Sequence, residues 1–199
     1  MPPDATETKR RILAASRAEF ARYGLAGARV DRIALNARAN KRSLYLHFGA
    51  KEELFDLVVG TSLLELAEAV PFDAADLPTY AADLFDLLHE HPDVARLTSW
   101  AVLERPHPIE AETGAYREKI AAIADAQAAG IISADHDPAI LMVMIIALVT
   151  GWTNSSWALR SLTKAEAENP PARFRDDLIT AVRATLRPSV ERPSAVPRS

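Results

Sequence analysis

The sequence predicts an all-α fold, in which several short helices at the N-terminus precede a bundle of longer ones. No proline occurs between Pro3 and Pro71, and the chain of 199 residues contains only 7 glycines. Apolar residues recur at spacings of three and four, the period of amphipathic helices. Alternating β-branched runs and Asn-Gly turns, which mark strands and hairpins, are not found in the sequence.

Cap residues and apolar spacing define the expected N-terminal helices. The first ends at Gly24, a natural stop. The second has Val30, Ile33 and Ala34 at helical spacing. A break at 38–40 follows, with Asn40 as the N-cap of the third. The expected ranges are 6–24, 30–37, 41–48 and 51–69.

Prolines separate the later helices. Asp137 followed by Pro138 is a good N-cap with proline at the first helical position. The segment 188–199 is rich in proline and serine, so we expect a disordered tail. The expected helices are 77–90, 93–104, 110–129, 138–160 and 172–187.

Composition restricts the class of protein. The absence of cysteine excludes disulfides, thiolate catalysis and cysteine-bound zinc. The N-terminus lacks the apolar stretch of a signal peptide, and the longest apolar run, 139–152, is shorter than the roughly 20 residues of a membrane-spanning helix. We therefore expect a cytoplasmic protein without a membrane partner.

The net charge of −4 is unevenly distributed. Residues 1–60 carry 11 Lys and Arg against 7 Asp and Glu, a net of +4. Of the totals of 23 and 27, the remaining residues keep 12 and 20, a net of −8. A basic head on an acidic body indicates that the head meets a polyanion.

The second and third expected helices have the arrangement of a helix-turn-helix, which places its second helix in the DNA major groove. Lys41 and Arg42 directly follow the N-cap, and Lys51 begins the next helix. Cations there oppose the helix macrodipole, at a cost of about 0.3–1 kcal/mol each. Phosphates beside them would outweigh that cost, and Arg29 fits the same interpretation. A solvated polar face remains the alternative for each residue alone.

At these residues the sequence resembles the TetR family of one-component repressors. The similarity runs from about Ile12 to Val58, and its most specific part is Leu44-Tyr45-Leu46-His47-Phe48 followed by Lys51-Glu52-Glu53-Leu54. The resemblance implies a helix-turn-helix three-helix domain over 1–48 and a helical ligand-binding and dimerisation domain over 49–187. It further implies a homodimer on a palindromic double-stranded DNA operator, controlled by a small-molecule effector.

The resemblance also implies roles for single residues. Tyr45, His47 and Lys51 would contact the DNA backbone, and the first turn of the recognition helix would contact bases. Within that turn Arg42 is the better candidate for a bidentate guanine contact. The sequence departs from the family at Arg38, where glycine is usual, so Arg38 must adopt a left-handed backbone if the turn is kept. The predicted DNA-binding residues are Arg29, Asn40, Lys41, Arg42, Ser43, Tyr45, His47 and Lys51.

A second candidate site lies around the proline-rich loop that follows the helix at 93–104. Trp100, Glu104, His107 and Tyr116 combine polar groups with apolar bodies, which is typical of a ligand pocket. We predict that they line a site for a small, largely apolar effector. Core packing is the alternative for the aromatic residues.

The apolar run 139–152 also predicts self-association. It is apolar nearly all round, and a second apolar helix face occurs at 174–186. From the two features together we expect a helix-packed homodimer. A single central core helix is the alternative.

Catalysis finds no support in the sequence. The histidines of His89-Glu90-His91 do not share a helix face, so we expect neither a metal site nor a cofactor. Nucleophile motifs and phosphate-binding glycine loops do not occur, and we expect a protein that is not an enzyme. Two alternatives remain. One is a helical enzyme or small-molecule carrier whose basic head binds an acidic partner, and the other is a helical interaction protein without a ligand.

Overall fold

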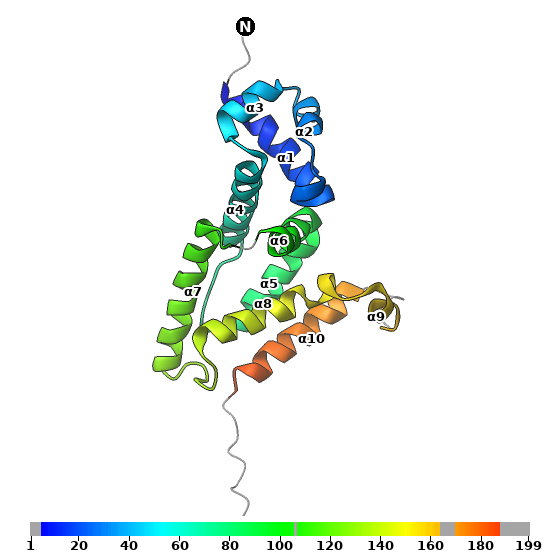
Figure 1. Cartoon of the computed structure of the whole chain (residues 1–199). Coiled ribbons are helices and arrows are strands. Elements are labelled where there is room, and N and C mark those ends of the chain that lie inside the picture. Colours follow the sequence, from blue (N-terminus) through cyan, green and yellow to red (C-terminus); the bar gives the residue numbers. More distant parts are fainter. Residues whose placement is uncertain (1–4, 106, 164–169, 188–199) are drawn as a thin grey trace, which may run out of the picture. The chain divides into compact units, whose positions relative to one another are not determined.

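The computed structural model describes residues 5–105, 107–163 and 170–187, and within these ranges its regular structure is entirely helical (Figure 1). This confirms the all-α prediction. None of the helices described is long and apolar enough to cross a membrane. The helices are α1 (Ala5–Gly27), α2 (Val30–Asn36), α3 (Lys41–Phe48), α4 (Lys51–Ala69), α5 (Leu77–Glu90), α6 (Pro92–Glu104), α7 (Glu110–Ala128), α8 (Pro138–Asn154), α9 (Trp157–Ser161) and α10 (Pro170–Thr185).

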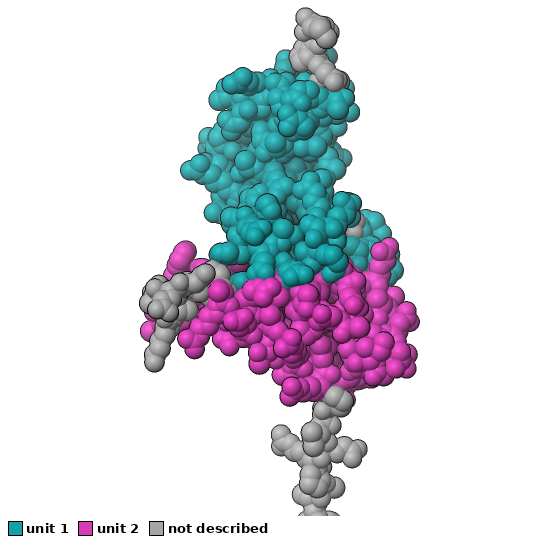
Figure 2. Space-filling model, turned by 180° about the vertical axis from the view of Figure 1, so that it is seen from behind, with its two compact units in different colours: residues 1–71, 83–117 teal, residues 72–82, 118–199 magenta. Residues whose placement is uncertain are grey.

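The chain divides into two compact units (Figure 2). Unit 1 comprises residues 1–71 and 83–117, and unit 2 comprises residues 72–82 and 118–199. The functional division at residues 48 and 49 stays a prediction, because it concerns what each part binds. The predicted tail 188–199 lies outside the described residues.

Unit 1 is built around α1, which packs against α2, α4 and α6. Its core includes Phe20 and Phe55, both fully buried, whose rings meet edge to face at 5.1 Å. Ile33 from α2, Leu44 from α3 and Leu97 from α6 complete the same cluster. The short helices α2 and α3 are thereby anchored on α1 and α4, since two turns of helix have little stability alone.

The end of α1 differs from the prediction. Gly24 interrupts the helix with φ 68° and ψ −177°, but the chain resumes a helical turn and ends at Gly27. The reason is long-range: the Glu104 carboxylate accepts hydrogen bonds from the backbone N–H groups of Leu25 and Ala26 and so caps the new turn. The sequence identified the break but gave no local sign of this cap.

Unit 2 contains α8 packed against α10. Leu141, Ile145 and Val149 of α8 are buried, as are Leu178 and Val182 of α10. Asp137 caps α8 as predicted, accepting from the backbone N–H groups of Ala139 at 2.9 Å and Ile140 at 3.2 Å.

The prediction of one helix over 138–160 is wrong. Helix α8 ends at Asn154, and Ser155 is extended, with φ −71° and ψ 149°. Ser156 then starts α9, because its hydroxyl accepts a hydrogen bond from Leu159 N at 3.1 Å. The Ser156 cap, together with the Ser155 hydroxyl that donates to Trp152 O at 2.8 Å, divides an otherwise continuous apolar pattern.

Candidate functional site

The turn between α2 and α3 fixes the direction of α3. Arg38 has φ 49°, so a non-glycine residue occupies the left-handed region there, as the retained turn geometry requires. Ala39 N donates to Ala34 O at 2.9 Å and closes the end of α2. Asn40 then caps α3, its Oδ1 accepting from Arg42 N at 2.8 Å. Both predictions for this turn are confirmed.

Helix α3 buries one residue and exposes most of the others. Leu44 is fully buried and holds the helix on the core. Lys41, Arg42, Tyr45 and His47 are exposed, and Ser43 is half-buried. The side chains predicted to meet DNA thus lie on the accessible surface of a helix whose backbone is fixed at both ends.

Lys41 forms an ion pair with a carboxylate of the preceding helix. Its Nζ lies 2.8 Å from a carboxylate oxygen of Asp31 on α2, and both side chains are substantially exposed. The hydrogen bond that the Lys41 ammonium donates to the Asp31 carboxylate is the main cause that raises the pKa of Lys41. Lys41 is therefore directed toward α2.

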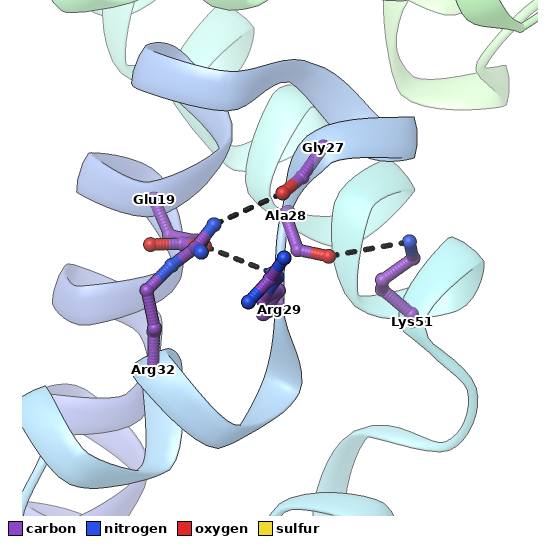
Figure 3. A network of polar contacts seen from close by, with 6 residues as sticks. All are labelled: Glu19, Gly27, Ala28, Arg29, Arg32 and Lys51. Carbon is purple, nitrogen blue, oxygen red and sulfur yellow. Dashed lines mark hydrogen bonds and ion pairs between the residues drawn. The ribbon is translucent and has the colours of Figure 1, made fainter.

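A buried carboxylate holds the start of α2 (Figure 3). Glu19 on α1 is 4% exposed, and its Oε1 accepts from Arg29 N at 2.9 Å and from Arg32 Nε at 2.8 Å. Arg32 Nη2 also donates to Gly27 O at 3.0 Å. The side chain of Arg29 gives α2 no cap of its own, and Glu19 supplies the missing acceptor. This network joins α1 to the beginning of the helix-turn-helix.

Arg29 and Lys51 flank the same backbone segment in Figure 3. Lys51 Nζ donates to Ala28 O at 3.4 Å, and the Arg29 side chain is exposed next to it in sequence. The start of α4 is fixed separately: Gly49 has φ 70°, and Glu53 accepts a hydrogen bond from Ala50 N at 2.6 Å. Arg29 at the start of α2 and Lys51 at the start of α4, both predicted to contact the DNA backbone, thus lie beside the same segment of the protein chain.

Trp100 and Glu104 lie against α1. A Cβ added at Gly24 would be 2.8 Å from Trp100 Cε3 and 2.8 Å from Glu104 Oε2. Both side chains therefore pack directly against the break in α1. Arg96, which lies nearer the N-terminal end of α6, donates to Ala21 O at 2.9 Å and to Arg22 O at 3.3 Å. Helix α6 thus binds the carbonyls before the break and the N–H groups after it. This gives Trp100 and Glu104 a structural role, and their part in ligand binding stays a prediction.

The other two predicted ligand residues are placed separately. His107 is exposed in the connection between α6 and α7, and Tyr116 is half-buried on α7. Burial and, secondarily, the nearby Glu112 carboxylate raise the pKa of Tyr116. Within the described ranges, no hydrogen bond or ring contact joins His107 or Tyr116 to Trp100 or Glu104.

Several residues that shape this site escaped the sequence analysis. Glu19, Asp31, Arg32 and Arg96 all bind partners on other helices. Their sequence context shows only charged residues on amphipathic helices, which is the common pattern of a solvated face. Contacts between helices far apart in the chain leave no local signal.

Comparison with known proteins agrees with this geometry. The family model for bacterial regulatory proteins of the tetR family matches residues 12–58, and the one for the tetracyclin repressor-like C-terminal domain matches residues 76–184. The HTH-type transcriptional repressor SCO4008 of Streptomyces coelicolor is 40% identical over 154 residues, which are 75% of this chain and 79% of the relative.

Two solved structures share the architecture. SCO4942 from Streptomyces coelicolor, described as a transcriptional regulator, is 37% identical, with a TM-score of 0.78 over 89% of this chain and 97% of the other. GusR of Salmonella enterica is 25% identical, with a TM-score of 0.69 over 94% of this chain and 97% of the other. These matches, with the helix-turn-helix formed by α2 and α3, show that the chain belongs to the TetR family and is a DNA-binding transcriptional repressor, not an enzyme.

Proposed function

We propose that this repressor binds a palindromic operator as a homodimer and is released by a small apolar effector. The observation that carries the proposal of DNA binding is the fixed cationic surface at the starts of α2, α3 and α4, where Arg29 and Arg42 are exposed and Lys51 is half-buried. Arg29, Arg42 and Lys51 have no carboxylate partner among the described residues. Unpaired cations on rigid backbone are the groups that neutralise DNA phosphates with little reorganisation.

The proposed contacts follow from position on the recognition helix. Lys41, Arg42 and Ser43 form the first turn of α3, where side chains reach base edges in the major groove. Arg42 is the proposed guanine reader, worth about 1–3 kcal/mol of discrimination. The remaining five, Arg29, Asn40, Tyr45, His47 and Lys51, position the helix on the DNA backbone.

The homodimer is supported by the surface of unit 2. Although α8 packs on α10, Ile140 and Val143 of α8 stay exposed, one helical turn apart. A two-fold axis would place the same apolar stripe of a second copy against this one, so that the contact removes both stripes from water. Two recognition helices set about 34–36 Å apart can then read successive major grooves.

The effector part rests on the connection between α6 and α1. Trp100, Glu104, His107 and Tyr116 are the proposed lining, with His107 at the exposed connection after α6. Because Arg96 and Glu104 bind backbone groups on both sides of Gly24, a ligand that displaces α6 also changes the end of α1. Such a ligand acts only through a difference in affinity between two arrangements of the helices.

The test begins with selection of bound sequences from random duplex DNA. Binding of the selected operator and of mismatched duplexes is then measured by fluorescence anisotropy across a salt series. Arg42→Ala is expected to lose affinity mainly for the selected operator, and Lys51→Ala to lose affinity equally for both. Arg183→Ala, an exposed cation of α10, is the matched control and should change neither.

Two results would contradict the proposal. Failure to enrich any palindrome would contradict the proposed palindromic operator. If Arg42→Ala lost equal affinity for matched and mismatched duplexes, Arg42 would have no role in reading bases. The effector is tested separately, by asking whether apolar compounds quench tryptophan fluorescence and change operator affinity together. Trp100→Ala is expected to uncouple the two effects.

A further inference from the structure

Unit 2 holds a half-buried ammonium that the DNA-binding function does not use. Lys119 Nζ on α7 donates a hydrogen bond to the Tyr80 hydroxyl at 3.1 Å. It also lies 4.9 Å from the centre of the Tyr80 ring and 5.6 Å from that of Phe72. The two rings meet edge to face at 4.9 Å, so they form one fixed aromatic wall beside the nitrogen.

None of the described carboxylates neutralises this charge. Within the part of the chain that the structure describes, no Asp or Glu forms an ion pair with Lys119, whereas Lys41 and Arg105 each have such a partner. Burial alone lowers the pKa of Lys119. Burying an ammonium without an anion is costly, and the two aromatic faces recover only part of the cost.

The local geometry prepares the nitrogen to bind an anion. An ammonium has three N–H donors, and the Tyr80 hydroxyl occupies one of them. Tyr80 is itself buried at 3% exposure, so the phenol oxygen fixes the direction of the ammonium. The remaining donors are available to an oxygen anion, and the adjoining Phe72 ring offers an apolar surface to the body of the same ligand.

We propose that Lys119, Tyr80 and Phe72 form a binding site for the carboxylate of a small organic acid with an apolar body. The proposal rests on the proposed function only in assuming that the protein responds to an effector, and it names the charge and the class of ligand for a second site, separate from the one proposed around Trp100, Glu104, His107 and Tyr116. It assigns recognition to residues of unit 2 that the sequence analysis had not selected. A charge-assisted hydrogen bond from a half-buried ammonium distinguishes an acid from its neutral analogue.

The experiment compares matched probes that differ only in their head group, without DNA. The probes are 3-phenylpropanoate with 3-phenylpropan-1-ol, and octanoate with octan-1-ol, and binding to the full chain is measured by calorimetry. At least one acid is expected to bind at least about tenfold more tightly than its alcohol. Lys119→Met should abolish that preference, Lys119→Arg should retain most of it, and Tyr80→Phe should reduce it while keeping the ring. Arg183→Met, on exposed α10, is the control cation and should leave the preference unchanged.

A second readout does not depend on the variants folding. In a sample with isotope-labelled lysine, the Lys119 side-chain NMR signal should shift on addition of the acid and not of the alcohol. Equal binding of acids and alcohols, no binding of either acid at millimolar concentration, or an unmoved Lys119 signal would each overturn the site. Operator affinity is then measured with and without the acid that binds; if it stays constant, the Lys119 site stands and control of DNA binding through that site fails.

Discussion

Lys41 and Asp31 form an ion pair of 2.8 Å between the first turn of α3 and the first turn of α2. The pair lies on the surface proposed to meet DNA, so the Asp31 carboxylate both occupies Lys41 and adds negative charge opposite phosphates. Since both side chains are substantially exposed, the pair contributes little to stability.

Asp31→Asn is therefore expected to strengthen DNA binding. Removing the carboxylate frees Lys41 and deletes one repulsive charge, which should raise affinity by about two- to tenfold at low salt and less at high salt. Anisotropy titrations across a salt series measure the effect. Glu68→Gln, an exposed carboxylate near the far end of α4, is the control and should change affinity far less. Weaker binding by Asp31→Asn would show that Asp31 orients Lys41 productively.

Glu19→Gln tests the buried network beneath the helix-turn-helix. Glu19 accepts hydrogen bonds from Arg29 N and from the Arg32 guanidinium while almost fully buried. The amide keeps the shape but removes the charge, so we expect the free energy of unfolding to fall by about 1–3 kcal/mol. Urea denaturation followed by circular dichroism measures the loss. Glu68→Gln serves again as the exposed control, and an equal response of the two variants would mean that the Glu19 network contributes nothing beyond a surface carboxylate.

Gly24→Ala and Gly114→Ala should have opposite effects on stability. At Gly24 the φ of 68° is unfavourable for alanine, and a Cβ there meets Glu104 and Trp100 at 2.8 Å. We expect a loss of at least about 2 kcal/mol. At Gly114, within α7, a Cβ meets nothing within 4 Å, so alanine should stabilise by about 0.5–1 kcal/mol. Urea midpoints of the two variants give the comparison, and a neutral Gly24→Ala would show that α6 is not held closely against the break.

The sequence was a good guide to local structure in the N-terminal part and a poor one to contacts between helices. The Asn40 cap and the left-handed Arg38 were predictable, because caps and turns depend on neighbouring residues. The cap from Glu104 on the end of α1 was not, since its partners lie 78 and 79 residues away. Trp100 and Glu104 were selected for their composition alone, which does not distinguish a ligand pocket from a packed helix contact.

The homodimer is tested on the exposed stripe of α8. Val143 is 63% exposed, and Val143→Glu places a charge where the second copy is proposed to pack. Sedimentation equilibrium at micromolar concentration should show a dimer for the unchanged protein and a largely monomeric variant, because an unpaired buried charge costs several kcal/mol. Val102→Glu, on α6, changes a valine that is 84% exposed and should leave the dimer intact. Dimers of equal stability in both variants would place the interface elsewhere.

Leu46 is expected to read thymine. It is 78% exposed near the C-terminal end of α3, and it lies four residues after Arg42 on the same helix face. An exposed leucine beside the arginine proposed to read guanine is suited to contact the C5-methyl group that only thymine presents in the major groove. Replacing single thymines of the selected operator by deoxyuridine removes that methyl group and nothing else.

At one position or more, deoxyuridine should weaken binding of the unchanged protein by about fourfold, the equivalent of about 0.8 kcal/mol per buried carbon. Leu46→Ala should bind the thymine and deoxyuridine operators equally at that position. Leu35→Ala changes a leucine of α2 that is 76% exposed, and it should keep the full sensitivity of the unchanged protein. If Leu46→Ala still distinguishes thymine from deoxyuridine at every position, another side chain contacts the methyl group, and Leu46 has no part in base recognition.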